Sequence, residues 1–284
     1  MGALRDQMDA DLVVRGMAVR TREAYLGAVA QLAKYYRRRP DRISEREIGR
    51  YLLYLIEERK LSWSTCNIAK QGLKFFYRVT LKRSESQFEI PRSRTRQKLP
   101  EILSQEEVAR LIEQTANLKH RTILMTTYAT GLRLNEVCHL RLSDIDSDRM
   151  TIRVEQGKGG KDRYTLLSPR LLAELRRYWV VYRPTQWLFT RRQGTGPIAD
   201  GTLQRLYNTA KKRAGIAKTG GIHALRHAFA THLLEAGVDV HTIQRLMGHG
   251  HISTTQRYFH LARKHLTGTT SPLELLDGVR SPPR

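Results

Sequence analysis

One segment divides this sequence and thereby limits how the chain can fold: SESQFEIPRSRTRQKLP, residues 84–100. It contains two prolines and no helical period, whereas the sequence on either side repeats apolar residues at helical spacing. We therefore predict two domains, residues 1–83 and residues 101–270, joined by a linker over 84–100 and followed by a tail over 271–284.

The second half of this linker is strongly basic. Its basic residues occupy every second position: Arg92, Arg94, Arg96 and Lys98. An extended chain with this spacing could follow a phosphate backbone, so we predict that these side chains contact nucleic acid. A flexible linker without such contacts is the simpler interpretation.

The charge of the whole chain also favours a polyanionic partner. The 284 residues include 50 Lys and Arg against 27 Asp and Glu, a formal net charge of +23, and the excess lies in both predicted domains. Nucleic acid and an anionic membrane surface suit such a charge. No apolar run is long enough to span a bilayer, and an excess spread over both halves fits a long contact with a phosphate backbone, so we expect nucleic acid and no membrane partner. The absence of a signal-peptide pattern and the presence of only two distant cysteines, Cys66 and Cys138, predict a cytoplasmic protein.

The first predicted domain is a bundle of four helices with short connections. Thr21 is expected to cap one of these helices. Ser44 and Glu47 have the spacing of a capping box at the start of another. Either Ser62 or Ser64 can cap the last helix.

The second predicted domain is mainly α-helical with a small β-sheet. Ser104 and Glu107 repeat the capping-box pattern. Two short alternating segments, 151–156 and 163–167, flank the glycine-rich GKGGKD and predict a β-hairpin. Further helices are predicted at about 119–130, 134–139, 169–181, 201–214, 223–236 and 239–247.

One predicted helix carries a cluster of basic side chains in HALRHAFATHLLEAG. The spacing places His223, Arg226 and His227 on one face. Such a face suits a phosphate, because arginine can donate to two oxygens and histidine can donate or accept a proton. Taken alone, a solvated polar face explains the pattern equally well. A zinc site is disfavoured, because Ala224 stands where the HExxH pattern requires glutamate.

The glycine-rich segment GKGGKD is not a phosphate-binding P-loop. Glu155 stands where that motif requires glycine, and Asp162 stands where it requires serine or threonine. An ordinary solvated turn and a hairpin tip that carries a lysine to a phosphate both remain open.

Two further segments contain residues that are unremarkable in isolation. Arg133 in ATGLRLNEV stands at a helix junction, where a surface arginine is usual. In GHGHISTTQRYFH, two glycines leave His249 on a tight turn, and Ser253 is predicted to cap a helix that contains Tyr258. A tyrosine on such a helix usually has a structural role.

Taken in order, these segments resemble the tyrosine recombinase (phage integrase) family, most closely its simple Xer-type members. The motifs are ATGLRLNEV, GKGGKDR, HALRHAFATHLLEAG and IQRLMGHGHISTTQRYFH, and the resemblance covers most of the chain. It implies an N-terminal core-binding domain and a catalytic domain that close around DNA as a C-shaped clamp. It also implies six catalytic residues: Arg133, Lys158, His223, Arg226, His249 and the nucleophile Tyr258.

Other residues receive weaker assignments from the resemblance. Lys161 is a less favoured candidate for the hairpin lysine, His227 is expected to support the site, and His223 to orient or deprotonate Tyr258. Lys161 and Arg163 are further candidates for DNA contact. The segment 271–279 could dock on a neighbouring protomer.

The implied activity is site-specific recombination through a 3′-phosphotyrosine intermediate, without ATP, metal or cofactor. The expected partners are double-stranded DNA with two short core sites, further copies in a tetramer, and a second recombinase subunit as an additional candidate. A type IB-like topoisomerase and a non-catalytic DNA-binding protein on the same scaffold are the alternatives.

Overall fold

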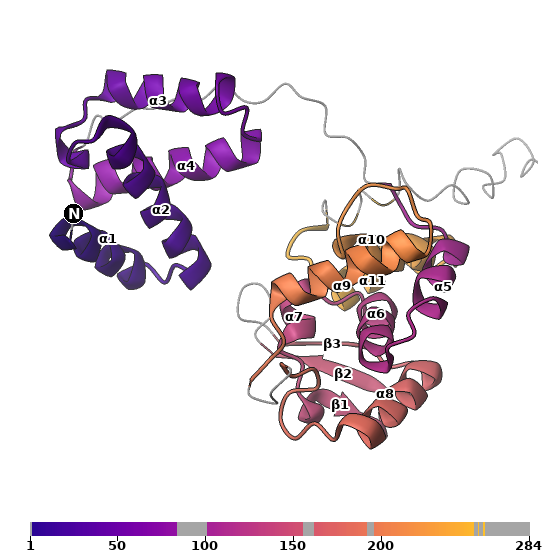
Figure 1. Ribbon diagram of the computed structural model, residues 1–284. Coiled ribbons are helices and arrows are strands. Elements are labelled where there is room, and N and C mark those ends of the chain that lie inside the picture. Colours follow the sequence, from indigo (N-terminus) through magenta and orange to yellow (C-terminus); the bar gives the residue numbers. More distant parts are fainter. Residues whose placement is uncertain are drawn as a thin grey trace, which may run out of the picture. The chain divides into compact units, whose positions relative to one another are not determined.

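The computed structural model describes residues 2–83, 101–155, 162–191 and 196–252, together with residues 255 and 258. The chain folds into two compact units, Met1–Gln97 and Lys98–Arg284. Figure 1 shows the helices and strands of each unit. None of the described helices is both long and apolar enough to cross a membrane.

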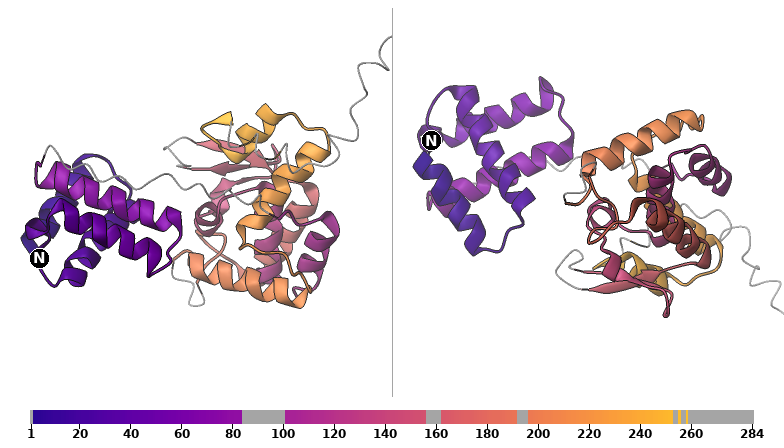
Figure 2. Two further views of the ribbon diagram at one scale, coloured as in Figure 1. Left: turned by 90° about the horizontal axis from the view of Figure 1, so that it is seen from above. Right: turned by 60° about the horizontal axis from the view of Figure 1, so that its bottom comes forward.

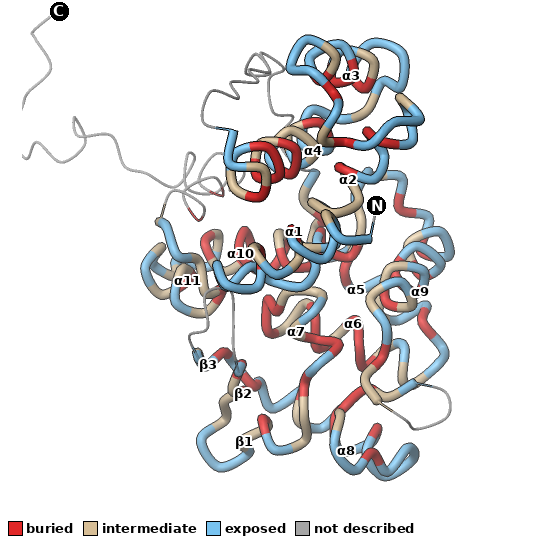
Figure 3. The backbone as a smooth tube through the Cα atoms, turned by 90° about the vertical axis from the view of Figure 1, so that its left-hand side faces the viewer, coloured by how far each residue is buried: buried red, intermediate tan, exposed pale blue. Residues whose placement is uncertain are grey.

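The first unit contains the predicted helical bundle. Its helices are α1 (Gly2–Val14), α2 (Val19–Tyr36), α3 (Glu45–Glu57) and α4 (Trp63–Phe75), with short helical turns at Pro40–Arg42 and Phe76–Thr80. The buried residues of α3 lie on one side of the helix, as Figure 3 shows, and pack against α2 and α4: Ile48, Tyr51, Leu52 and Leu55. The apolar residues that repeat at helical spacing in the sequence therefore form the core of this unit.

Most of the predicted caps of the first unit are present. Ser44 Oγ accepts from the backbone N–H of Glu47, and Glu47 Oε2 accepts from that of Ser44 at 2.9 Å, which completes the capping box. Ser62 caps α4 by accepting from the N–H of Thr65 at 3.2 Å. The predicted Thr21 cap is wrong, because the chain already turns before residue 18 and α2 begins at Val19.

The second unit is built around one buried helix. The described helices are α5 (Gln105–Glu113), α6 (Leu118–Thr130), α7 (Leu134–Cys138), α8 (Pro169–Tyr182), α9 (Asp200–Arg213), α10 (His223–Glu235) and α11 (Val240–Met247), with a short turn at Leu142–Asp144. Helix α6 contacts α5, α7, α8, α9 and α10, and it also contacts strand β3 of the sheet. It therefore forms the centre of this unit.

Several buried positions of α6 are threonines rather than apolar residues. Thr122, Thr126, Thr127 and Thr130 are almost fully buried. Each hydroxyl donates to the backbone carbonyl four residues earlier, at 2.6 to 2.8 Å. These bonds satisfy the hydroxyls inside the helix, so a polar sequence can lie in a core.

A small antiparallel sheet lies against these helices. Its strands are β1 (Ile145–Asp146), β2 (Thr151–Val154) and β3 (Arg163–Leu166), in the order β1-β2-β3. The predicted hairpin is therefore present, with Val154 opposite Arg163, whereas the two-residue β1 was not predicted. Thr165 Oγ1 donates to the carbonyl of Thr130 at 2.8 Å, which ties β3 to the end of α6.

Helix α11 lies beside β3. Both views in Figure 2 show the C-terminal helices next to the strands, and α11 contacts β3. Helix α10 packs against α6 and α11. The ends of α6, α11 and β3 therefore converge, and several of the predicted catalytic residues lie on or beside these elements.

Candidate active site

The junction of α6 and α7 sets the position of Arg133. Helix α6 ends at Gly131, which has a left-handed φ of 61°. A Cβ atom at this position would lie 2.3 Å from Cδ1 of Phe229, so only glycine fits here without displacement. Arg133 then forms the N-cap position of α7 and points toward the end of α11.

Arg133 is held by a carboxylate and a carbonyl. Its Nη1 donates to Oε1 of Glu136 at 2.8 Å, and its backbone N–H donates to Oε2 of the same residue at 2.7 Å. Its Nη2 donates to the carbonyl of Gly248 at 2.6 Å. The side chain keeps 23% of its surface exposed, so it can still meet a ligand.

Arg226 lies deeper, on α10, and is 6% exposed. It donates to the carbonyl of Gly131, to that of Met247 at 2.6 Å, and to Nε2 of His249 at 3.0 Å. Burial, followed by the charge of Arg133, lowers the pKa of Arg226 to about 10. The guanidinium therefore stays positively charged at neutral pH.

The two contacts of His249 define its protonation. Arginine can only donate, so Nε2 of His249 accepts from Arg226. Nδ1 consequently carries the proton and donates to Thr255 Oγ1 at 2.8 Å. Burial, and then the charges of Arg226, Arg133 and Arg163, lower the pKa of His249 to about 4. The ring is therefore neutral at pH 7 in the free protein.

Tyr258 is part of the same cluster. It is 5% exposed, and its Oη lies 3.0 Å from Nδ1 of His227. Its ring lies nearly parallel to that of His249, with an angle of 8° and centroids 6.4 Å apart. Burial, and then the neighbouring His223 and Arg226, lower the pKa of His227. A neutral His227 can accept the phenolic proton.

His223 occupies the first turn of α10 and is exposed. Within the described residues its side chain makes no hydrogen bond, and desolvation followed by the charges of Arg226 and Arg133 lowers its pKa. The contact with Tyr258 that we expected of His223 is made by His227. One helical turn separates the two histidines, and the sequence spacing alone did not distinguish them.

The remaining predicted residues divide into two groups. Arg92, Arg94, Arg96, Lys98, Lys158, Lys161 and the predicted cap Ser253 lie outside the described residues. Arg163 is described, and its side chain points inward: it is 10% exposed and bonds to Glu136 and to the carbonyl of Leu246. A DNA contact by Arg163 stays a prediction.

The sequence analysis missed Glu136. This residue is 9% exposed at its side chain and bonds to both Arg133 and Arg163. Its position three residues after Arg133, at the start of a helix, is a signal that could have revealed it. Among the described residues, no group of three histidine, cysteine or acidic side chains is arranged to hold a metal ion.

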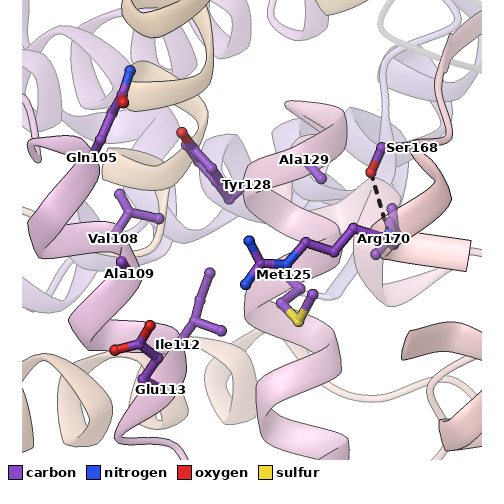
Figure 4. Close-up of a pocket in the computed structure, with 11 residues that line it drawn as sticks. Gln105, Val108, Ala109, Ile112, Glu113, Met125, Tyr128, Ala129, Ser168 and Arg170 are labelled. Atoms are coloured by element: carbon purple, nitrogen blue, oxygen red, sulfur yellow. Dashed lines mark hydrogen bonds between the residues drawn. The ribbon is translucent and has the colours of Figure 1, made fainter. Parts of the chain in front are cut away.

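A separate pocket opens between α5, α6 and α8. It has a volume of about 310 Å³, and Figure 4 shows Val108, Met125, Tyr128 and Arg170 around it. Tyr128 also bonds to Nδ1 of His232 at 2.8 Å. The described lining residues include none of the cluster around Arg226, so this pocket is not part of the candidate site.

Two profiles of one protein family match the chain. The Phage integrase family matches residues 101–265, and the Phage integrase N-terminal SAM-like domain matches residues 4–86. The chain therefore belongs to the phage integrase family of tyrosine recombinases. It is an enzyme of the integrase type, as the motifs predicted.

Named relatives support this assignment. The chain is 43% identical over 277 residues to the putative integrase/recombinase y4qK of Sinorhizobium fredii, a match that covers 97% of this chain and 90% of the relative. It is 33% identical over 233 residues to tyrosine recombinase XerA of Pyrococcus horikoshii, covering 80% of this chain and 81% of the relative.

A solved structure supports the fold. The XerH site-specific recombinase bound to a palindromic difH substrate, in a post-cleavage complex, superposes with a TM-score of 0.70 at 22% identity. The match covers 92% of this chain and 82% of that one. At this identity the likeness establishes the fold alone.

Proposed function

We propose that this enzyme is a site-specific recombinase that cleaves and rejoins double-stranded DNA through a 3′-phosphotyrosine intermediate. The observation that carries the proposal is the position of Tyr258. Its hydroxyl lies 3.0 Å from His227, and its ring lies parallel to that of His249, which itself bonds to Arg226. A nucleophile, a proton acceptor and a cationic donor thus meet in one cluster.

In the proposed first step, the Tyr258 oxygen bonds to the scissile phosphorus and the bond to the 5′ oxygen breaks. The phenolic proton passes to neutral His227, and Lys158 donates a proton to the departing 5′ oxygen. Arg133 and Arg226 neutralise the charge that develops on the non-bridging oxygens. Three of the five N–H groups of Arg226 are engaged by described residues, which leaves donors for a phosphate.

In the proposed second step, a 5′-hydroxyl attacks the phosphotyrosine and releases Tyr258. The number of phosphoester bonds stays constant, so the cycle requires no ATP. His249 orients Arg226 through its Nε2, and the exposed His223 contacts a phosphate oxygen from the first turn of α10.

Strand exchange between two duplexes requires four cleavages. A tetramer supplies four active sites, and cyclic symmetry provides equivalent interfaces between the copies. We further propose that the two domains, 1–83 and 101–270, close on DNA as a C-shaped clamp in the cytoplasm. The net charge of +23 supports contact with the phosphate backbone, through Arg92, Arg94, Arg96, Lys98 and Lys161 among others.

The proposal is tested by trapping the covalent intermediate. DNA fragments from the enzyme's genetic neighbourhood are nicked so that cleavage releases a short 3′ piece, and the reactions are stopped with SDS. The expected result is an SDS-stable adduct at one site with the wild type and none with Tyr258→Phe. Binding without an adduct in either protein would indicate a non-catalytic DNA-binding protein.

A second assay separates recombination from topoisomerase activity. Two differently labelled duplexes that carry the trapped site are incubated together, and a supercoiled plasmid is incubated in parallel. Recombination predicts products that combine the two labels. Relaxation of the plasmid without combined products would instead indicate a type IB-like topoisomerase.

A further inference from the structure

We propose that Arg163 is a positioning residue of the active site, which holds Arg133 and the C-terminal end of α11 in place through its contacts with Glu136 and Leu246. This inference rests on the proposed function, because it concerns the same cleavage reaction. It assigns to Arg163 a role distinct from the DNA contact that the sequence suggested.

The first observation is a shared carboxylate. Arg163 donates from Nη1 to Oε1 of Glu136 at 2.9 Å and from Nη2 to Oε2 at 2.7 Å. The same two oxygens accept from the Nη1 and the backbone N–H of Arg133. Glu136 thus lies between the two arginines, and Arg163 fixes the plane of the carboxylate that orients Arg133.

The second observation is a series of three consecutive carbonyls at the end of α11. Leu246 accepts from Nε of Arg163 at 3.1 Å, Met247 from Arg226 at 2.6 Å, and Gly248 from Arg133 at 2.6 Å. A helix C-terminus leaves its last carbonyls unpaired and carries a partial negative charge, so it attracts cations. Two of these arginines are proposed to meet the phosphate, whereas Arg163 is committed to the scaffold.

The third observation is the close approach of the backbone to Arg163. Gly248 has a left-handed φ of 61°, and a Cβ atom there would lie 2.7 Å from Cδ of Arg163. The glycine therefore allows the arginine to pass directly beside the turn that carries His249. Arg163, which lies on β3, therefore contacts both Glu136 and this turn.

The electrostatics agree with this geometry. Burial alone would raise the pKa of Glu136, but the hydrogen bonds and charge of Arg163, and then those of Arg133, lower it to about 2. Arg133 already donates twice to Glu136, so without Arg163 this carboxylate would be held by Arg133 alone of the two arginines. A lysine cannot replace Arg163 here, because its single ammonium group cannot donate to both oxygens of Glu136 in the plane of the carboxylate as a guanidinium does.

The test compares Arg163→Met and Arg163→Lys with Arg153→Met. Arg153 is the matched control, because it lies on the neighbouring strand, keeps 39% of its side chain exposed, and pairs with Glu155 and Asp144 rather than with Glu136. Single-turnover cleavage of the trapped site, DNA affinity and thermal unfolding are measured for each. We expect cleavage by both Arg163 variants to fall about 10- to 100-fold at saturating DNA, since a small misplacement of a catalytic group has this effect. The control should stay within about twofold of the wild type.

A second substrate separates positioning from a general loss of structure. A methylphosphonate at the scissile position lacks one anionic oxygen, so cleavage depends less on an arginine that neutralises it. If Arg163 acts through Arg133, then Arg163→Met and Arg133→Met both lose less activity on the methylphosphonate than on the ordinary phosphate. Arg163→Lys keeps a cation beside Glu136, and it carries the comparison if the methionine variant is unstable.

The outcomes are distinct. Equal losses on both substrates, or cleavage at the wild-type rate, would overturn the role of Arg163 while leaving the proposed function intact. No adduct with wild-type enzyme on either substrate would overturn the proposed function, and this inference with it.

Discussion

The first unit and the α10–α11 region of the second unit use charged side chains in different ways. In the first unit, the pair of Arg22 and Asp9 lies at the surface, with 26% and 35% of the two side chains exposed. Near the end of α11, only 10% of the Arg163 side chain and 9% of the Glu136 side chain are exposed, and Arg226 is 6% exposed. Surface pairs contribute about 0–1 kcal/mol, whereas a buried charge that loses its partner is strongly destabilising.

This difference indicates what each region is built for. The first unit is stabilised by apolar helix faces, and its charged side chains lie mostly at the surface, where a partner can reach them. The α10–α11 region holds Arg163 and Arg226 largely away from water, beside carbonyls at the end of α11. Such an arrangement costs stability, so its presence supports a catalytic role for that region.

The largest expected effect comes from Tyr258, the proposed nucleophile. Tyr258→Phe removes one oxygen from a ring that packs in the α10–α11 core, so DNA binding and thermal unfolding should change little. Adduct formation should fall by more than about 10⁴-fold, because no other described group can replace the phenol. SDS gels of trapped complexes measure this. An adduct in the Phe variant would require a different nucleophile.

Arg226→Met should affect both activity and stability. Cleavage is expected to fall about 10²- to 10³-fold through loss of an oxyanion donor. The free energy of unfolding should fall by about 1–3 kcal/mol, because the carbonyls of Gly131 and Met247 lose their donor. Urea denaturation and single-turnover cleavage measure the two effects. Arg22→Met, on the surface pair of the first unit, is the matched control for stability.

Two glycines with similar backbone angles sharpen the comparison between the regions. Gly16 in the first unit has φ of 65° and no atom within 4 Å of the place that a Cβ would take, whereas Gly248 has φ of 61° and faces Arg163. Gly16→Ala should cost about 1 kcal/mol, the conformational penalty alone. Gly248→Ala should cost more and should also slow cleavage. Denaturation curves and single-turnover cleavage measure both; equal stability losses and normal cleavage in both variants would contradict the tight contact at Arg163.

The stability of the second unit should depend on pH through His249. Its pKa in the folded protein is about 4, below the usual 6.5, so the unfolded chain binds a proton at a higher pH than the native state does. Stability from this group is therefore present above about pH 6.5 and is lost as the pH falls toward 4. The stability measured by denaturation should fall less steeply from pH 7 to pH 4 for His249→Asn than for the wild type. Parallel profiles for the two proteins would mean that His249 does not titrate in this range.

The smallest expected effect is that of the surface pair itself. Arg22→Met should change the free energy of unfolding, measured by urea denaturation, by much less than Arg226→Met does, because water screens these surface charges. The change should diminish further in high salt. A loss as large as that of Arg226→Met would remove the contrast between the two regions.

The local signals in the sequence were sufficient for most of the helices. Capping boxes at Ser44 and Ser104 and the apolar spacing of α3 act within a few residues, so they can be recognised without the fold. The predicted Thr21 cap failed because Ala18, which has no capping side chain, precedes the helix instead. The strand β1 was missed because two residues carry no period, and only pairing with β2 defines them.

The order of the motifs determined the family and named Arg133, Arg226, His249 and Tyr258, which the structure brings together. The tertiary structure decided which neighbours these residues have. Only the fold places His227 rather than His223 against Tyr258, and only the fold turns Arg163 inward onto Glu136. The physical reason is that a sequence pattern specifies residue type and the face of an element. The partner of a charged side chain is set by which distant backbone and side-chain groups remain unpaired after the elements pack.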